Sequence, residues 1–426
     1  MRNFLLLALL AITCFSWTSR LSAQDVINLG VNDSLGLAIR SYAGLAPDLT
    51  VVIPSGYSNP EGAGAAIKSI DLSSTLTPIS TTLKKITIKG DGSKPTLKIK
   101  TFVLPASLST ALKFQDLNII GADPVAANNY LINNASANPV PIVDTISLKG
   151  CSVSNFRGMI RLQTSGTTYK NIVINNSIIS NIVDYTLINV AAGTTVDNIV
   201  ISNSTVYGVS GTLLTLSAGN ALSKVTISNS TFDNVVMTST KYFIDFGTAN
   251  ASPVLTISNT IIGKNFGSGV KGIRGAANWT YTTTNSYTTS DWVTSGNALT
   301  GFTAYTSTAA TLFKTPTTYV VGAPQSASIG DYSIIDATFA GKNNAGDPRW
   351  YSATTTDVSS PKASSIIISY NGIEISLTEA QDINIYSVTG NLLKSAKKVN
   401  VISVTDLPKG IYLVKAGSAV RKLMIN

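Results

Sequence analysis

The middle of the chain repeats one short pattern of apolar and polar residues. In each copy the two kinds alternate and the run then stops at Asn, Gly or Asp. The apolar centres of the copies are Ile88, Phe114, Leu148, Ile174, Ile201, Ile227 and Ile257, and they are 26 to 34 residues apart. Alternation with a period of two predicts a short strand with one buried face, and the residue that ends it tolerates a left-handed backbone.

One such strand cannot bury its apolar face alone, so the copies must stack on one another. The intervals contain further strand-like runs, such as residues 186–190 and 212–216. Two or three strands in each repeat are typical of a parallel β-helix, whereas the period of two excludes helical repeats and the frame of a leucine-rich repeat is missing. A short helix over residues 35–42, starting after Asp33 or Ser34, is expected to cover the open end of the core.

Four asparagines occupy the same place in successive copies, namely Asn176, Asn203, Asn229 and Asn259. When the copies stack, their amides can form hydrogen bonds from one coil to the next. Such a ladder resembles the right-handed parallel β-helix of pectate-lyase-like proteins, and the resemblance implies that these asparagines are structural. The sequence therefore predicts an all-β protein built on a right-handed parallel β-helix, a solenoid.

A stretch without the repeat, residues 278–351, closes this region. Its part from Asp331 to Trp350 resembles the closing segment of uncharacterised Bacteroidota β-helix proteins, which are often found among secreted glycan-processing proteins. That resemblance offers no catalytic residues to carry over. We expect Arg349 and Trp350 to cap the solenoid rather than to bind sugar.

The chain changes character near Pro361, where short strand-like runs begin to alternate with turns. This pattern predicts a small C-terminal β-sandwich. Residues 383–390, 407–415 and 421–426 resemble the C-terminal sorting domain of the type IX secretion system of the Bacteroidota. The resemblance implies a transport address that is usually removed on export, with the type IX secretion machinery as its partner.

The N-terminus reads as a secretory signal peptide. Arg2 precedes an apolar run over residues 4–14 that is too short to span a membrane, and Ala23 fits the position before cleavage. The sequence predicts four parts, which are a signal peptide (1–23), a β-helix (24–351), a linker (352–365) and a sorting β-sandwich (366–426). We expect a protein that is secreted or held at the outer-membrane surface, with no transmembrane segment in the mature chain.

The composition excludes several kinds of catalytic and metal site. The chain has no histidine, which excludes Ser-His-Asp and Cys-His catalysis and histidine metal sites. The net charge is +9, but residues 24–360 hold 21 basic and 18 acidic residues, so the charge does not indicate nucleic-acid binding. Loss of the signal peptide would remove Cys14 and leave Cys151 alone, as a small buried residue. We expect no metal site and no cofactor.

Sugar cleavage by hydrolysis usually needs paired carboxylates, and lyase chemistry needs a Lys, Arg or Tyr base, often with bound calcium. The chain has no Asp-Asp or Asp-x-Asp cluster, and Glu61 is the single Glu in residues 24–360. The outward positions of the repeated strand carry lysines only on the early coils, at Lys89, Lys113 and Lys149. These three lysines are candidates for binding an anionic glycan.

The second strand-like segment carries Arg161, Asn189, Thr215 and Asp245 at outward positions. Arg161 and Asp245 should lie three coils apart, roughly 14 Å, which is too far for a tight pair but short enough for a groove. Charged residues nearby in the same phase complete a set of candidate catalytic residues, which is Arg157, Arg161, Asp184, Lys241 and Asp245.

Two functions remain open at this point. The first is a non-catalytic surface protein that binds a polysaccharide, possibly an anionic one, or acts as an adhesin-like scaffold. The second is a polysaccharide lyase or hydrolase that acts on acidic glycans, with calcium as a cofactor only if it is a lyase. Solenoids of this kind host both functions, and the missing carboxylate constellation favours the first.

Overall fold

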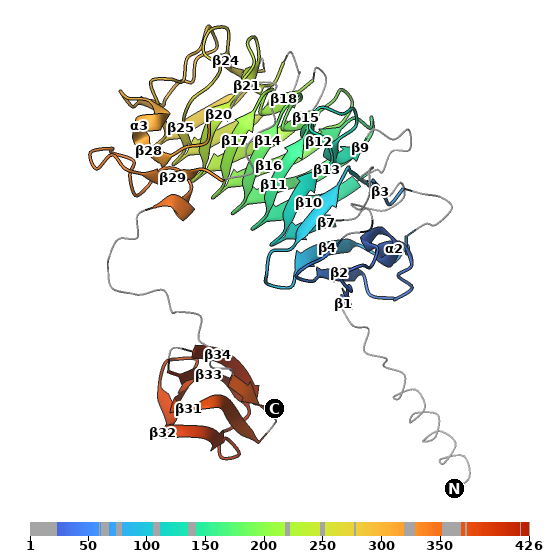
Figure 1. The fold of residues 1–426 in the computed structure, drawn as a ribbon, viewed down its shortest axis with the longest axis vertical. Helices are drawn as coiled ribbons and strands as arrows, with labels where there is room; N and C mark the ends of the chain where they lie inside the picture. The colour runs from blue at the N-terminus through green and yellow to red at the C-terminus, as the bar shows by residue number, and fades with distance from the viewer. Residues whose placement is uncertain are drawn as a thin grey trace. The chain divides into compact units, whose positions relative to one another are not determined.

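The structure is a computed structural model. It describes residues 24–58, 60, 68–73, 79–104, 111–134, 142–217, 222–247, 252–276, 278–318, 329–351, 368–370, 373–417 and 419–425. The chain divides into two compact units, Met1–Ser352 and Ala353–Asn426, and each is described by itself (Figure 1). The predicted signal peptide (1–23) and linker (352–365) lie outside the described residues.

The first unit winds through three parallel sheets (Figure 1). In the described residues the first sheet has ten strands, which are β1 (Gln24–Asn28), β2 (Asp48–Ile53), β4 (Lys85–Gly90), β7 (Ala111–Gln115), β10 (Ile142–Lys149), β13 (Thr168–Asn175), β16 (Thr195–Ser202), β19 (Leu222–Ser228), β22 (Val254–Ser258) and β25 (Thr280–Thr284).

A second and a third sheet follow within each coil. Among the same residues the second sheet consists of β5 (Thr96–Ile99), β8 (Asn118–Gly121), β11 (Ser152–Phe156), β14 (Ile178–Ile182), β17 (Thr205–Val209), β20 (Thr231–Val235), β23 (Ile261–Ile262), β26 (Tyr287–Thr288) and β27 (Thr303–Ala304). The third consists of β3 (Ile70–Asp71), β6 (Phe102–Val103), β9 (Tyr130–Asn134), β12 (Gly158–Leu162), β15 (Ile188–Val190), β18 (Leu214–Leu216), β21 (Tyr242–Asp245) and β24 (Lys271–Arg274).

The prediction of a parallel β-solenoid is confirmed, with about 9 turns. The apolar centres of the repeat lie opposite one another in the first sheet: Ile174 lies opposite Leu148 on one side and Ile201 on the other. Ile172, Ile174, Ile199 and their counterparts are buried, so the stacked coils share one continuous apolar core. Burial of this column supplies most of the drive to stack, because each coil alone would expose it.

The first sheet continues beyond the point where the sequence loses its repeat. Strand β25 pairs in parallel with β22, and Thr283 lies opposite Ile257. This strand therefore belongs to the solenoid although the sequence repeat is already lost there. A terminal strand can pair through its backbone alone, so Thr residues that break the apolar pattern do not prevent pairing.

Asparagines make the sharp turns between the first and second sheets. Asn176, Asn203, Asn229 and Asn259 have φ values of 48°, 49°, 47° and 49°, in the left-handed region that Asn tolerates better than most residues. The amide of Asn259 donates to Oδ1 of Asn229 at 2.9 Å, and Asn285 on the next coil donates to Oδ1 of Asn259 at 2.8 Å. The ladder therefore extends one coil further than the sequence pattern indicated.

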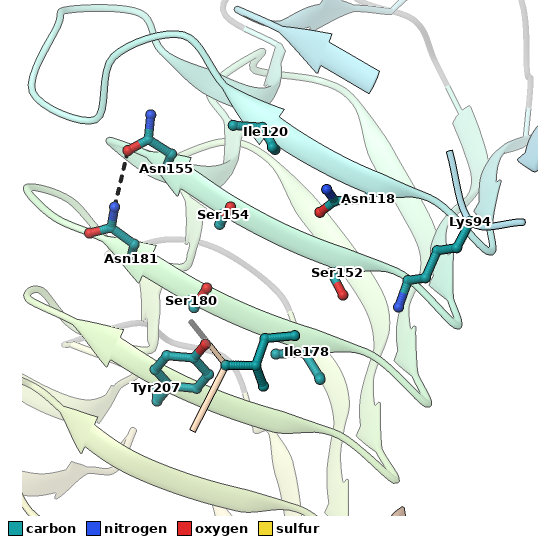
Figure 2. Close-up of a pocket in the computed structure, with 11 residues that line it drawn as sticks. Lys94, Asn118, Ile120, Ser152, Ser154, Asn155, Ile178, Ser180, Asn181 and Tyr207 are labelled. Carbon is teal, nitrogen blue, oxygen red and sulfur yellow. Dashed lines mark hydrogen bonds between the residues drawn. The ribbon is translucent and has the colours of Figure 1, made fainter. Parts of the chain in front are cut away.

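A second set of left-handed asparagines was not expected from the sequence. Asn155, Asn181 and Asn234 have φ values of 67°, 52° and 49°, within the strands of the second sheet. The amide of Asn181 donates to Oδ1 of Asn155 at 3.0 Å (Figure 2). These residues bend β11, β14 and β20 at the same place, where β17 between them has Gly208 with φ of 64°.

The short helix expected at the N-terminal end is α2 (Leu35–Arg40). Ser34 caps it, because the Ser34 hydroxyl accepts a hydrogen bond from the Leu37 backbone N–H at 3.0 Å. Leu35 and Ile39 are fully buried in the solenoid core. The helix thus covers apolar side chains at that end of the solenoid.

The chain after the last coil folds back along the second sheet. The described residues of this closing segment, 305–318 and 329–351, contain α3 (Ala309–Leu312), β28 (Phe313–Thr315), β29 (Asp331–Ile334) and the 3₁₀ turn η2 (Pro348–Trp350). Nε1 of Trp350 donates to Oγ1 of Thr205 at 2.6 Å, and Nη2 of Arg349 donates to Oδ1 of Asn176 at 2.8 Å. The expectation that these two residues cap the solenoid is wrong, since they lie on its flank.

The second unit is antiparallel. Its described strands are β30 (Ile368–Tyr370), β31 (Glu374–Ser387), β32 (Leu392–Ser403), β33 (Gly410–Ala416) and β34 (Ala419–Ile425). Ile383, Ile385, Val414 and Ala416 are buried in a core of its own. No helix in the described parts of either unit is long and apolar enough to cross a membrane.

Candidate functional site

The third sheet turns one continuous column of polar side chains outward. Parallel pairing places the members of the column opposite one another, and they are Asn133, Arg161, Asn189, Thr215, Asp245 and Arg274. Tyrosines and further charged groups flank the column. We call the column together with Tyr130, Arg157, Asp184, Tyr185, Lys241, Tyr242 and Lys271 the third-sheet face.

Arginine and tyrosine side chains are packed together at the early end of this face. The Arg161 guanidinium carbon lies 5.2 Å from the centroid of the Tyr130 ring and 6.0 Å from that of Tyr185. Beside it, Nε of Arg157 forms an ion pair with Oδ2 of Asp184 at 2.7 Å. Burial raises the pKa of Tyr130, so this hydroxyl stays protonated at neutral pH and is a poor base.

The late end of the face holds a second ion pair. Nε of Arg274 lies 2.7 Å from Oδ1 of Asp245, and Nη2 lies 2.8 Å from Oδ2. The Tyr242 ring lies 4.8 Å from the Arg274 guanidinium carbon and 5.5 Å from Nζ of Lys271. The hydrogen bond to Asp245 raises the pKa of Arg274, so that guanidinium remains charged.

Between the two ends the surface is hollowed into a cavity of about 290 Å³. Asp184, Lys241 and Asp245 line it together with Asn189, Thr215 and Tyr242. The structure thus brings together three of the five residues that the sequence put forward as catalytic. Arg157 and Arg161 are not among the lining residues, but each contacts one of them, Asp184 and Tyr185 respectively.

The charges of the third-sheet face do not balance. Five cations share it with two carboxylates, and an arginine binds each carboxylate. Within the described residues Arg161, Lys241 and Lys271 form no ion pair. The face therefore retains an excess of positive charge over an aromatic and hydroxyl-bearing surface, and it is suited to a polyhydroxylated anion.

Neither this face nor the rest of the described chain offers a metal centre. Calcium takes six to eight oxygen ligands, whereas arginines already bind the carboxylates of Asp184 and Asp245. No group of three or more Cys, Asp and Glu that could hold a metal ion is found in the described residues. The residues present do not fit a calcium-assisted lyase site.

The three lysines of the first sheet are divided between two columns. Lys89 and Lys149 lie in one column, with Gln115 between them, whereas Lys113 lies in the neighbouring column opposite Thr87 and Ser147. They do not form a single row of charge. This surface is a weaker candidate for glycan binding than the third-sheet face.

Sequence reasoning missed several residues of the site, namely Tyr130, Tyr185, Tyr242, Lys271 and Arg274. One signal was available for the last two. Residues 271–274 and 242–245 both have isoleucine at the third position, and Ile273 lies opposite Ile244 in the structure. Aligning these two runs would have placed Arg274 beside Asp245.

A buried carboxylate lies under the closing segment. Asp233 is 1% exposed and lines a cavity of about 360 Å³ with Lys264 and Asp291. The Lys264 backbone N–H donates to Oδ1 of Asp233 at 2.9 Å, and the Asn234 amide donates to Oδ2 at 2.8 Å. Burial raises the pKa of Asp233 to about 7, and the nearby charge of Asp291 acts in the same direction.

The single cysteine of the described residues is inert. Cys151 is fully buried and forms no disulfide. Burial raises the pKa of its thiol to about 11, so little thiolate is present at neutral pH. Cys151 is therefore not an activated nucleophile.

Comparison with known families agrees with the division into two parts. Residues 360–426 match the model of the secretion system C-terminal sorting domain. Residues 70–190, within the solenoid, match a domain of unknown function, DUF4957. No curated protein matches the chain. The chain thus combines a parallel β-solenoid with a type IX secretion sorting domain, which directs it to the cell surface or the extracellular space.

Proposed function

We propose that the exported solenoid binds acidic glycans along the third-sheet face and does not cleave them. The observation that carries the proposal is the pairing of both carboxylates with arginines, which leaves Arg161, Lys241 and Lys271 to meet anionic groups. Sugar carboxylates or sulfates would supply the missing negative charge. The surface location that the sorting domain implies is compatible with contact with an extracellular polymer.

The spacing of the face supports a polymeric ligand. Successive coils are about 4.8 Å apart, as in any sheet. Asn189 and Thr215 lie on neighbouring strands between the two charged ends. A polysaccharide laid along the solenoid would meet one amide or hydroxyl on each coil and a cation at both ends. Tyr185 and Tyr242 add aromatic surface beside this path.

Hydrolysis is the second candidate, and one observation favours it. Asp184 and Asp245 line the same cavity on coils two apart, roughly 10 Å along the axis, which is near the separation used by inverting enzymes. Against it, Arg274 binds both oxygens of Asp245, and Arg157 binds Asp184. A carboxylate held in this way is poorly placed to give or take a proton. We therefore favour binding without cleavage.

A binding titration tests the proposal. Full-length protein would be titrated with polygalacturonate, alginate and heparan sulfate, and with neutral dextran as the comparison. We expect at least one acidic polymer to bind and dextran not to bind. Lys241→Ala and Arg161→Ala should each weaken binding about fivefold or more.

A matched control is available on another sheet. Lys224 is exposed on strand β19 of the first sheet, so Lys224→Ala removes the same charge away from the third-sheet face. It should leave affinity unchanged. Equal weakening by Lys224→Ala and Lys241→Ala, or equal binding of dextran, would refute a site on the third sheet.

A further inference from the structure

A second hollow lies on a different side of the solenoid, on the outer surface of the second sheet. It has a volume of about 500 Å³, within the range of small-molecule sites. Its floor comes from the outward side chains of β8, β11 and β14, and Tyr207 and Ile329 also line it (Figure 2). We call it the second-sheet groove. None of its lining residues belongs to the third-sheet face.

The groove exists because the closing segment covers only part of the second sheet. On later coils Ile261 and Tyr287 are buried in a cluster with Phe313, Tyr332 and Phe339 of that segment. The cover reaches strand β17, where the Tyr207 and Tyr332 rings lie 5.6 Å apart. On the earlier strands Ile178 is still buried in this cluster, but Asn118, Ile120, Ser152, Ser154 and Ser180 remain partly exposed.

The floor of the groove suits a sugar. The floor combines hydroxyls and amides with two isoleucines (Figure 2). The hydroxyls are those of Ser152, Ser154 and Ser180, the amides are those of Asn118, Asn155 and Asn181, and the isoleucines are Ile120 and Ile178. Oδ1 of Asn181 is buried and has no hydrogen-bond partner among the described residues. Carbohydrate hydroxyls can bond such amide and hydroxyl groups, while the partly exposed Ile120 offers apolar surface to the ring.

Among the described residues that line the groove, Lys94 is the one cation, and none is a carboxylate. Lys94 lies at one edge, and Asn155 and Asn181 lie at the other (Figure 2). The backbone of Lys94 has φ of 57° directly before Pro95, a left-handed conformation that is uncommon for a lysine. Such strained positions concentrate at ligand sites.

The charges around Lys94 favour an anionic ligand beside it. Partial desolvation lowers the pKa of Lys94, and the positive charge of Arg349 on the closing segment lowers it further, although Cys151 and Asp116 act in the opposite direction. Nε of Arg349 lies 3.7 Å from Oδ2 of Asp347, whereas Lys94 forms no ion pair within the described residues. An anionic group in the groove would therefore meet Lys94.

We propose that the second-sheet groove binds a short saccharide that carries an oxyanion, either a carboxylate or a sulfate. Its anionic group would meet Lys94, and its ring hydroxyls would lie over Ser152, Ser154 and Asn181. The volume fits a saccharide of one or two rings rather than a long polymer. The groove would thus act separately from the third-sheet face.

Calorimetric titration of the full-length protein tests this proposal with three probes. They are digalacturonate, a sulfated disaccharide and the dimethyl ester of digalacturonate, which is neutral. We expect at least one of the two acidic probes to bind, and their comparison tells carboxylate from sulfate. Lys94→Gln should weaken that binding about fivefold or more. Binding of neither acidic probe, or equal binding of the neutral ester, would overturn the proposal.

A bulky substitution provides a second and independent test. Ser154 and Ser147 lie on the same coil and are both half-buried, but Ser147 is on the first sheet. Ser154→Trp should fill the groove and reduce affinity at least tenfold, whereas Ser147→Trp should not. Equal effects of the two variants would contradict the proposal. If Ser154→Trp lowers Tm more than Ser147→Trp does, the titration of Lys94→Gln decides whether the groove binds the saccharide.

The two sites can be told apart. Arg161→Ala alters the third-sheet face alone, so it should leave the binding of the short probe unchanged. Loss of short-probe binding in Arg161→Ala would place that ligand on the third sheet and refute the second-sheet groove.

Discussion

Arg274 binds Asp245 with two parallel hydrogen bonds, Nε to Oδ1 at 2.7 Å and Nη2 to Oδ2 at 2.8 Å. The two residues lie opposite each other on neighbouring strands of the third sheet. Asp245 is the more buried partner, with 14% of its side chain exposed against 42% for Arg274. The pair neutralises the carboxylate that would otherwise repel an anionic ligand from this face.

Removing that carboxylate should strengthen binding. Asp245→Asn keeps the shape of the side chain, removes one negative charge and leaves Arg274 free to meet a sugar oxyanion. We expect affinity for an acidic polymer to rise about threefold to tenfold at low salt, with a smaller gain at high salt because the charges are then screened. Titration of both proteins with the same polymer measures this. Weaker binding by Asp245→Asn would mean that Asp245 itself holds the ligand.

Stability should fall as pH rises, because of Asp233. Its pKa is raised to about 7, against about 4 for an unfolded chain. Between these values the folded protein holds a proton that the unfolded chain releases, so the free energy of unfolding decreases as pH rises through that window. Burial also raises the pKa of Asp347, which adds a contribution of the same sign. Carboxyls with lowered pKa, such as Asp331 at about 2, lose their contribution only at lower pH.

Thermal unfolding at pH 5 and pH 8 measures this effect. We expect Tm of the solenoid to be lower at pH 8 by about 5 °C or more. Lys264 and Asp291 line the same cavity as Asp233, so the change is assigned to Asp233 by comparison with Asp233→Asn. The variant should show a flatter dependence of Tm on pH. An equally steep dependence in the variant would remove Asp233 as the cause.

The asparagine ladder should contribute measurably to stability. Asn259 accepts from Asn285 and donates to Asn229, and its φ is 49°. Asn259→Ala loses both amide contacts and places an alanine in the left-handed region, so we expect a loss of roughly 2 kcal/mol. Asn259→Gly loses the same contacts without the backbone strain and should cost less. Denaturant unfolding of the two variants checks this order, and an alanine variant as stable as the glycine variant would contradict it.

The periodic part of the sequence is the part whose structure could be predicted. Ile174 and Ile201 could be placed opposite each other because stacked coils repeat both the apolar alternation and its spacing. The same regularity placed Arg161 and Asp245 in one column. The contact between Trp350 and Thr205 could not be predicted, because the closing segment follows no period and joins residues 145 positions apart.

The sorting domain should be required for export but not for folding of the solenoid. Deleting residues 407–426 removes β33 and β34, which hold Val414 and Leu423 of that unit's core. In a host with type IX secretion we expect the truncated protein to accumulate in the periplasm, detected by cell fractionation. Its solenoid should melt at the temperature of the full chain, since the two units have separate cores. Normal export of the truncated protein would contradict the role of this domain.

The most direct measurement follows binding and cleavage in one sample. Full-length protein is incubated with the acidic polymer that it binds best, with and without added calcium, while bound polymer, new reducing ends and the ultraviolet absorbance of unsaturated uronates are recorded. We predict saturable binding that is weakened by Lys241→Ala, with no growth of either product signal. Sustained product formation that is lost in Lys241→Ala or Asp245→Asn would contradict the binding function and make the third-sheet face an active site.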